Sequence, residues 1–311
     1  MAVVVTGAAG FVAFHLCERF LKEGQEVVGL DNLVSGQPDH AAALRKYPNF
    51  RWIETDIARP VEIPGEVSTV FNLACPASPV DFEPLSIEIM LTCSQGVLNM
   101  LNLALQKGAV FLHTSTSECY GDPLVHPQVE TYYGNVNPIG TRSPYDEGKR
   151  FAEALITAFH RRHKLPVRIA RVFNTYGPGM RADDGRVISN FIMQALDGRP
   201  LTVHGNGKQT RSFCYIDDLV EGILRLSKAD YTRPVNLGNP DEVTIRQVAE
   251  EIIELTGSAS TIVFVPHRAD DPAVRCPDIS LAKKLLGWSP QVPRPEGLAR
   301  TIEYFRKHGN A

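Results

Sequence analysis

A tyrosine and a lysine, Tyr145 and Lys149, stand four residues apart in the stretch SPYDEGKR at residues 143–150. Side chains at this spacing are neighbours on one face of a helix. A free phenol, with a pKa of about 10, is a weak base, but a nearby ammonium group favours the phenolate and lowers that pKa. The pair could therefore act as a general base near neutral pH. A lone pair of this kind is more often a polar surface pair, so its meaning depends on the rest of the chain.

Two glycines after the first apolar run form a second candidate site. Gly7 and Gly10, in TGAAGFVAFH at residues 6–15, have the spacing of a dinucleotide-binding loop. The first permits a tight turn, and the second lets the backbone approach a pyrophosphate at the N-terminus of the next helix. Asp31 follows after about 20 residues, where an acid accepts hydrogen bonds from the adenosine ribose and repels a 2′-phosphate. The pattern predicts bound NAD rather than NADP.

A glycine turn with a solvated aspartate is the alternative to this NAD site. The loop follows an apolar strand pattern and precedes an amphipathic helix pattern, which is the context that a dinucleotide-binding loop requires. We therefore expect further cofactor contacts from residues near the loop and at the ends of the next strands: Phe11, Val12, Asn32, Asp56, Ile57, Leu73 and Ala74.

The elements that must position these residues alternate along the first half of the chain. Helical patterns, the longest near 83–106 and 145–163, separate most of the apolar or β-branched runs at 2–6, 26–31, 50–57, 69–74 and 109–114. Such alternation predicts parallel strands joined by crossover helices. The predicted fold class is α/β, with a Rossmann-type doubly wound parallel sheet that a further strand at 167–177 extends.

The composition and the pattern of strands and helices change after residue 177. Pro and Gly become frequent, strands are short, and helical patterns return at 245–256 and 296–307. This predicts a smaller mixed α/β C-terminal substrate lobe. We expect residues 1–177 to form the NAD-binding domain, with parts of 205–240 returning to it, and residues 178–311 to form mainly the substrate lobe.

Composition excludes several kinds of partner. The 311 residues are 43% hydrophobic and carry a formal net charge of -3, which gives no electrostatic reason to expect nucleic acid or an anionic membrane. No apolar run reaches the length of a membrane span. The six cysteines include no Cys-x-x-Cys pair, which is typical of free thiols in a reducing compartment. We expect a soluble cytoplasmic protein without a metal site.

The motifs together resemble the extended short-chain dehydrogenase/reductase family of nucleotide-sugar enzymes over essentially the whole chain. The resemblance rests on the glycine loop, Asp31, NLA at 72–74, STSECYG at 115–121 and Tyr145-x-x-x-Lys149. Longer stretches are similar to the members that decarboxylate UDP-glucuronate: STSECYGDP, HPQVETYYGNVNPIG, YDEGKRFAE, FNTYGP, DDGRVISNFI, QTRSF, VNLGNP and DDPAVRCPDI. The last of these stretches and Glu118 discriminate best.

The resemblance implies a reaction at carbon 4 of the sugar. Tyr145 would remove the proton of the hydroxyl there while hydride passes to NAD, Lys149 would hold the nicotinamide ribose, and Thr116 would orient the hydroxyl. In a glucuronate the resulting ketone makes a β-keto acid, which loses carbon dioxide easily. Protonation of carbon 5 and return of the hydride would give UDP-xylose and regenerate a tightly held NAD.

Glu118 and Arg275 carry the decarboxylase part of this expectation. Glu118 would face carbons 4 and 5, acting either through its negative charge on the bound carboxylate or through a proton relay to carbon 5. Arg275 is expected at the pyrophosphate or as a mobile clamp near the sugar, and a surface ion pair with Asp270 or Asp271 is its structural alternative. Ser117 stands where sugar 4,6-dehydratases carry an aspartate, which argues against water elimination.

The remaining expected contacts fit a UDP-sugar. Asn174 and Arg211 are interpreted as pyrophosphate ligands, since a planar guanidinium pairs well with phosphate oxygens. By the same resemblance, the uridine pocket would be lined by Arg186, Val187, Thr202 and His204.

Several positions depart from the family pattern. Ala13 replaces the third glycine of the loop, and Phe14 stands where a small serine is usual, so the helix and strand are expected to pack less closely there. Leu91 and Cys93 replace a lysine and an asparagine, and Gly179 replaces an arginine. We expect the changes at 91 and 93 to remove polar contacts near the nicotinamide or the sugar.

Two other functions stay open. A UDP-sugar 4-epimerase or 4,6-dehydratase would use the same Tyr145 and Lys149, and release of carbon dioxide separates these reactions from decarboxylation. A non-catalytic NAD-binding regulator is the alternative from another class, and the intact set of Thr116, Tyr145 and Lys149 speaks against it. The resemblance also implies a homodimer, formed through the helices near 83–106 and 145–163.

Overall fold

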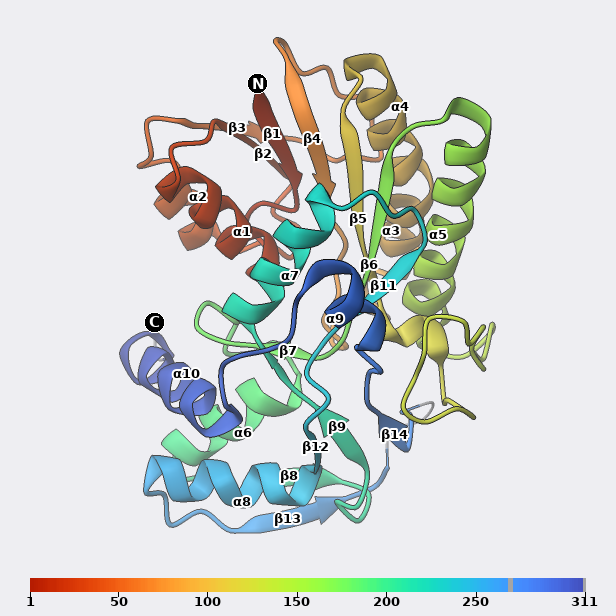
Figure 1. Ribbon diagram of the computed structural model, residues 1–311. Helices are drawn as coiled ribbons and strands as arrows, with labels where there is room; N and C mark the ends of the chain where they lie inside the picture. The colour runs from red at the N-terminus through yellow and green to blue at the C-terminus, as the bar shows by residue number, and fades with distance from the viewer. Residues whose placement is uncertain (268–270, 310–311) are drawn as a thin grey trace.

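A seven-stranded parallel sheet forms the centre of the computed structural model, which describes residues 1–267 and 271–309 (Figure 1). In order across the sheet, the strands are β11 (Pro234–Leu237), β6 (Val167–Val172), β5 (Val110–Thr116), β4 (Val67–Asn72), β1 (Ala2–Thr6), β2 (Val27–Asp31) and β3 (Phe50–Glu54). The chain winds outward from β1 to β3 and then returns to β4 on the other side. This order confirms the predicted doubly wound α/β fold, and it opens a crevice at the carboxyl ends of β1 and β4.

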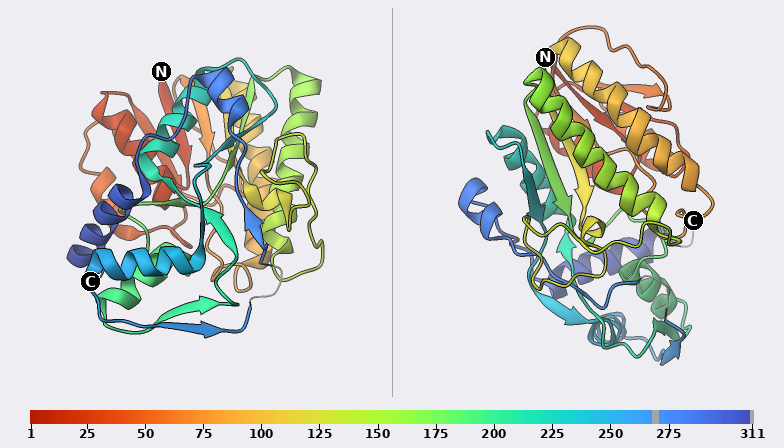
Figure 2. Two further views of the ribbon diagram at one scale, coloured as in Figure 1. Left: turned by 60° about the horizontal axis from the view of Figure 1, so that its bottom comes forward. Right: turned by 90° about the vertical axis from the view of Figure 1, so that its right-hand side faces the viewer.

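Helices cover both faces of the sheet (Figure 2). The helices on one face are α1 (Phe11–Lys22), α2 (Pro38–Leu44) and α7 (Ile216–Lys228), and those on the other are α3 (Ser86–Leu91), α4 (Val97–Lys107) and α5 (Ser143–His163). Side chains of a strand alternate between faces. Accordingly, Val3 and Val5 of β1 pack in the hydrophobic cluster of α1 and α7, while Val4 packs in that of α4 and α5.

The strand expected at 167–177 is interrupted. β6 ends at Val172, and β7 (Thr175–Tyr176) pairs with β10 (Cys214–Tyr215) outside the main sheet. The change of partner lies at Asn174, whose backbone oxygen accepts a hydrogen bond from the first residue of β10 at 2.8 Å. Asn174 therefore lies where the chain leaves the sheet, at the crevice.

The helix expected at 83–106 consists of three elements. A π-helical turn, η1 (Thr92–Gly96), separates α3 from α4 and contains the buried Cys93. Such turns insert an extra residue into a helix and are frequent at functional sites. Throughout residues 1–267 and 271–309, no helix has both the length and the apolar character needed to cross a membrane.

A smaller mixed lobe lies below the carboxyl edge of the sheet (Figure 1). It contains a three-stranded sheet in the order β12-β9-β14 and a two-stranded sheet of β13 and β8. The bounds of its elements are α6 (Val187–Leu196), β8 (Leu201–His204), β9 (Thr210–Ser212), β12 (Glu242–Thr244), α8 (Ile245–Thr256), β13 (Ile262–Val265), β14 (Val274–Arg275) and α10 (Arg294–His308), whereas α9 (Ser280–Leu286) packs on β11 and α7. The predicted domain boundary after residue 177 stays a prediction.

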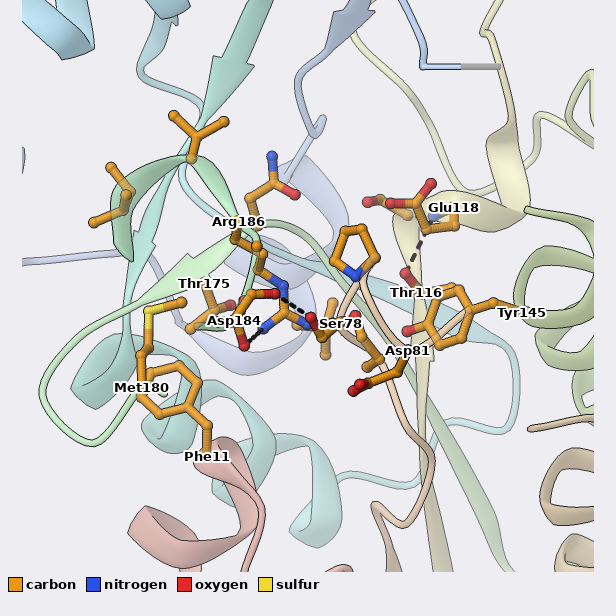
Figure 3. Close-up of a pocket in the computed structure, with 18 of the residues that line it drawn as sticks. Phe11, Ser78, Asp81, Thr116, Glu118, Tyr145, Thr175, Met180, Asp184 and Arg186 are labelled. Carbon is orange, nitrogen blue, oxygen red and sulfur yellow. Dashed lines mark hydrogen bonds and ion pairs between the residues drawn. The ribbon is translucent and has the colours of Figure 1, made fainter. Parts of the chain in front are cut away.

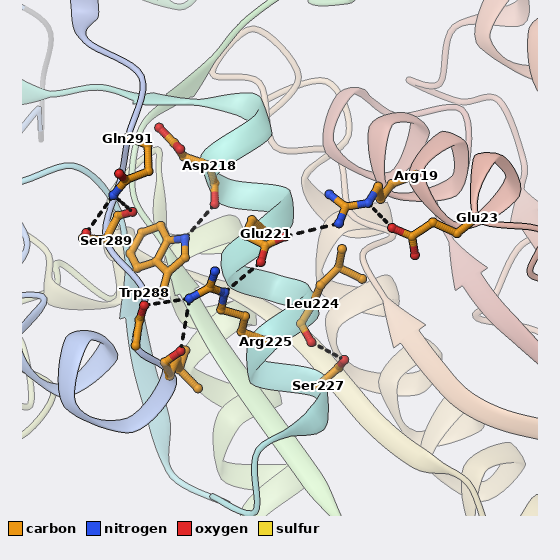
Figure 4. Close-up of polar contacts among 12 residues, drawn as sticks. Arg19, Glu23, Asp218, Glu221, Leu224, Arg225, Ser227, Trp288, Ser289 and Gln291 are labelled. Carbon is orange, nitrogen blue, oxygen red and sulfur yellow. Dashed lines mark hydrogen bonds and ion pairs between the residues drawn. The ribbon is translucent and has the colours of Figure 1, made fainter.

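Polar contacts attach the segment after α9 to α7 (Figure 4). The buried Trp288 donates its indole N–H to the backbone oxygen of Asp218 at 2.9 Å, and Arg225 donates to the backbone oxygen of Gly287 at 2.6 Å. Glu221 accepts from Arg225 at 2.7 Å and from Arg19 of α1 at 3.4 Å. The C-terminal part of the chain is thereby joined to the helices that cover the sheet.

Candidate active site

A cavity of about 340 Å³ opens at the carboxyl edge of the sheet, where β1, β5 and β6 face the small lobe. A second cavity of about 80 Å³ adjoins it and shares Gly7 and Gly10 of the loop with it. Thr116, Glu118 and Tyr145 lie together at one end of the larger cavity (Figure 3). The two cavities form one continuous site along the sheet edge.

Every residue that the sequence assigns to the site lines one of these two cavities. The smaller cavity contains Asp31, Asn32, Asp56, Ile57 and Ala74. The larger cavity contains Gly7, Gly10, Phe11, Val12, Leu73, Thr116, Glu118, Tyr145, Lys149, Asn174, Arg186, Val187, Thr202, His204, Arg211 and Arg275. The fold thus brings the assigned residues together, while their individual roles stay predictions.

The backbone of the glycine loop leaves room for a ligand. Gly7 has a φ of +70°, and a Cβ atom there would lie 2.8 Å from the Cα atom of Ala74, so only glycine fits. Asp31 stabilises the loop, because its two carboxylate oxygens accept the backbone N–H groups of Ala9 at 2.9 Å and Leu33 at 2.8 Å. The backbone of Asn32 is a third partner, which leaves the Asp31 carboxylate one lone pair for a ribose hydroxyl. The loop and Asp31 therefore fit a dinucleotide.

The Tyr145 phenol is buried beside Thr116. Burial raises the pKa of Tyr145, and a hydrogen bond with Thr116 offsets only part of that shift. Lys149 lies with its Nζ atom 5.8 Å from the centroid of the Tyr145 ring and donates instead to the backbone oxygen of Thr114 at 2.8 Å. In the protein without NAD, burial therefore raises the pKa of Tyr145, and the lowered pKa expected when Lys149 and the nicotinamide act together stays a prediction.

Glu118 is held by two arginines. Arg275 donates from Nη1 to Oε1 at 2.5 Å and from Nη2 to Oε2 at 2.8 Å, and Arg142 pairs with Oε2 at 2.8 Å. Burial by itself would raise the pKa of Glu118, but the charges and hydrogen bonds of Arg275 and Arg142 outweigh it. The net pKa lies well below the usual range for glutamate, so the Glu118 side chain is an anion.

The partners of Arg275 differ from those considered in the sequence. Asp271 pairs with Arg211 at 2.9 Å rather than with Arg275, and Asp270 lies outside the described residues. Sequence reasoning missed Arg142 altogether. Its only signal was its place three residues before Tyr145, since nothing local indicates that its side chain turns toward Glu118.

Polar contacts connect the two sides of the cavity in the region expected to bind uridine and pyrophosphate. Arg186 donates to the backbone oxygen of Ala77 at 2.6 Å and pairs with Asp184 at 3.3 Å, and Ser78 donates to the backbone oxygen of Asp184 (Figure 3). Arg211 is buried and already paired with Asp271. The guanidinium groups of Arg186 and Arg211 are therefore already paired with carboxylates of the protein.

Phe14, Leu91 and Cys93, which depart from the family pattern, lie in three different surroundings. The Phe14 ring stacks on the buried His40 at a centroid distance of 4.0 Å, which fills the space beside the loop. Leu91 is exposed and outside both cavities. Cys93 is buried, with its Sγ atom 3.6 Å from that of Cys75, a cavity residue. The change at 91 therefore does not affect the lining of the cavity.

Within the described part of the chain, no group of three or more His, Cys, Asp or Glu side chains is arranged to hold a metal ion. The larger cavity is lined by hydroxyls, a phenol, an ammonium group and guanidinium groups, and also by the carboxylates of Asp81, Glu118, Asp184 and Asp271. The guanidinium groups suit an anionic part of a ligand, and the carboxylates can accept hydrogen bonds from its hydroxyls.

Known proteins are similar to this chain over most of its length. The model of the NAD dependent epimerase/dehydratase family matches residues 3–238. UDP-glucuronic acid decarboxylase 1 of Arabidopsis thaliana is 51% identical over 306 residues, which cover 98% of this chain and 70% of the relative. UDP-glucuronic acid decarboxylase 1 of Xenopus tropicalis is 49% identical over 305 residues, covering 98% of this chain and 72% of the relative.

Two solved structures resemble the whole chain. UDP-glucose 4-epimerase of Thermotoga maritima with UDP-glucose has a TM-score of 0.89 and 29% identity, with 99% of each chain covered. UDP-glucuronic acid 4-epimerase of Bacillus cereus, in complex with UDP-glucuronic acid and NAD, has a TM-score of 0.88 and 27% identity, again with 99% of each chain covered. These comparisons confirm the resemblance inferred from the motifs.

Proposed function

Because the chain belongs to the NAD dependent epimerase/dehydratase family, we propose that it decarboxylates UDP-glucuronate to UDP-xylose with NAD that is regenerated in the site. The observation that carries this proposal is that Thr116, Tyr145 and Glu118, from motifs similar to those of the decarboxylases, meet at one end of a single cavity. The identity of about half with the curated decarboxylases supports the same reaction.

The chain would hold NAD along the two adjoining cavities. Gly7 and Gly10 leave room for the pyrophosphate, and Asp31 faces the cavity expected to take the adenosine ribose. When bound, NAD supplies a hydride acceptor and a positively charged ring. That charge near Tyr145 favours the phenolate, which the buried side chain does not form by itself.

At the sugar end, Thr116 orients the hydroxyl of carbon 4 and Tyr145 takes its proton. The ketone at carbon 4 then accepts the electron pair of the bond that breaks when carbon dioxide leaves carbon 5, and an enolate remains. A proton relay through Glu118 requires a protonated carboxyl group, which Arg142 and Arg275 oppose. The contacts therefore support an electrostatic or positioning role for Glu118 over a proton relay.

The nucleotide end of the sugar would lie against the small lobe. Asn174 and Arg211 are proposed as pyrophosphate contacts, and Thr202 and His204 of β8 line the part of the cavity proposed for uridine. The hydrogen bond to Ala77 holds the Arg186 side chain at the cavity wall. Arg186 could therefore contact the nucleotide without changing its conformation.

We propose that a second copy of the chain covers α3 and α5. These helices pack on each other and expose Ile87, Met90 and Phe151. Contiguous exposed apolar side chains typically mark an interface. The six cysteines are free and none forms a disulfide, which fits the proposed cytoplasmic location.

The experiment is to incubate the purified protein with UDP-glucuronate and to measure carbon dioxide together with the mass of the product. We expect UDP-pentose and one carbon dioxide per turnover. Tyr145→Phe keeps the ring that stacks on Phe82 at 4.8 Å but removes the base, and should slow turnover by roughly 10²–10⁴-fold. An isomeric hexuronate product would show an epimerase, and bound NAD without product would show a regulator.

A further inference from the structure

Arg142 connects the start of α5 to the reacting end of the cavity. Its backbone oxygen accepts the N–H groups of Tyr145 and Asp146, both at 3.1 Å, so the residue is fixed to the first turn of the helix that carries Tyr145 and Lys149. Arg142 also lines the larger cavity. Its side chain is therefore placed by the same backbone that places the proposed base.

The Arg142 side chain makes two contacts inside this region. Its Nη2 atom pairs with Oε2 of Glu118 at 2.8 Å. Its guanidinium carbon lies 5.2 Å from the centroid of the Phe82 ring, and that ring stacks on Tyr145 with an interplanar angle of 16°. The guanidinium thus touches Glu118 directly and Tyr145 through one intervening ring.

Arg275 alone does not fix Glu118 relative to Tyr145. Arg275 belongs to β14 of the small lobe, whereas Glu118 follows β5 and Tyr145 lies on α5. A bidentate pair with Arg275 fixes the carboxylate relative to the small lobe, and the contact with Arg142 fixes it relative to α5. Arg150 of α5 donates to the backbone oxygen of Cys119 at 2.9 Å and already fixes the backbone beside Glu118, so Arg142 adds a direct attachment of the Glu118 carboxylate to the same helix.

From these contacts we propose that Arg142 is a positioning residue, which holds the Glu118 anion against the helix of the base for the step that follows oxidation at carbon 4. The inference rests on the proposed function. Arg142 also adds a positive charge beside Glu118 and Arg275, and the buried carboxyl of Asp146 on the same helix interacts with all three groups.

Loss of Arg142 should separate the two halves of the reaction. Thr116 and Tyr145 do not depend on the charge of Arg142 for their mutual contact, so removal of the proton at carbon 4 continues. The Glu118 carboxylate loses its direct attachment to α5, so loss of carbon dioxide and protonation of carbon 5 slow down. The reduced nicotinamide and the ketone then accumulate during turnover, which a general loss of folded protein would not produce.

The test compares Arg142→Met, Arg142→Lys and the parent enzyme with NAD bound. Methionine keeps the apolar contact with Phe82 without the charge, and lysine restores one positive charge. Arg161→Met removes an exposed guanidinium from the far end of α5 and serves as the matched control. Carbon dioxide release, the absorbance of reduced nicotinamide during turnover, bound NAD and the thermal unfolding midpoint are measured for each protein.

We expect Arg142→Met to release carbon dioxide on the order of 10²-fold more slowly, as for a reacting group displaced by about 1 Å, with most of its nicotinamide reduced during turnover. Arg142→Lys should be intermediate, and Arg161→Met should match the parent. The inference would be overturned, and the proposed function left intact, by either of two results. One is carbon dioxide release by Arg142→Met at the rate of the parent. The other is slow carbon dioxide release by Arg142→Met and Arg142→Lys without accumulation of reduced nicotinamide. If the parent releases no carbon dioxide, the proposed function fails and the inference fails with it.

Discussion

Glu118 and Arg275 form a bidentate ion pair across the cavity, with Arg275 Nη1 at 2.5 Å from Oε1 and Nη2 at 2.8 Å from Oε2. The pair joins the turn after β5 to β14, and the Arg275 side chain is only 4% exposed. A charge that loses its buried partner is costly, whereas the intact pair contributes little net stability because both groups were desolvated to form it. The pair should therefore respond very differently to single and double substitution.

Glu118→Gln should lower the free energy of unfolding by about 3–5 kcal/mol, because Arg275 and Arg142 lose their carboxylate. Combining Glu118→Gln with Arg275→Met should restore part of this loss, since one unpaired buried charge disappears. Urea unfolding at one fixed NAD concentration gives the free energy of unfolding of the single and the double variant. Equal stability of Glu118→Gln and the parent would show that the guanidinium groups find other partners.

The ion pair also shows why the candidate site could be predicted only in part. Glu118 and Arg275 were both identified from their motifs, but 157 residues separate them and no local pattern encodes their contact. Arg142 carried no motif of its own and was missed. Glu118 and Arg275 could both be assigned because the motifs around them resemble those of the family, whereas their pairing depends on how the small lobe packs against the sheet.

The fold itself was predicted more completely than its irregular parts. The first five strands were expected within a few residues because apolar runs and helical periods alternate clearly. The interruption at Asn174 was missed, since the β-branched and apolar pattern continues through it while the hydrogen-bond partner changes to β10. The π-helical turn at Cys93 was also missed, because one extra residue hardly alters the apolar period.

Gly7→Ala should lower NAD binding sharply. The new Cβ atom would lie 2.8 Å from the Cα atom of Ala74, and backbone cannot move aside cheaply as the end of a side chain can. Gly24→Ala is the matched control, because its φ of +79° imposes similar strain while nothing lies within 4 Å of its Cβ position. Cofactor retained after gel filtration measures the effect. Equal retention in the two variants would contradict a cofactor cradle at Gly7.

His40 should make the protein less stable in mild acid. Burial lowers the pKa of His40 from 6.5 to about 4. Between these pH values the unfolded chain binds a proton that the folded chain does not, so stability falls as the pH drops from 6.5 toward 4. The full shift corresponds to about 3 kcal/mol.

His40→Asn should flatten this decline, even if it lowers stability overall by removing the stack on Phe14. His15, whose pKa burial also lowers, remains in the variant, so a smaller decline persists. Urea unfolding at several pH values between 4 and 6.5 gives both slopes. Parallel curves for the variant and the parent would exclude His40 as the source of the acid sensitivity.

Phe151→Glu should separate the proposed dimer. Phe151 is 51% exposed on α5, the helix that packs on α3, and a carboxylate buried there without a partner opposes association. Phe264→Glu on β13 is a matched control, because Phe264 is also 51% exposed but lies in the small lobe away from these helices. Light scattering should give twice the chain mass of 34.3 kDa for the parent and for Phe264→Glu, and the chain mass for Phe151→Glu. If the parent protein has the mass of one chain, the proposed dimer is refuted. If Phe264→Glu dissociates the dimer, the interface lies at the small lobe instead of at α3 and α5.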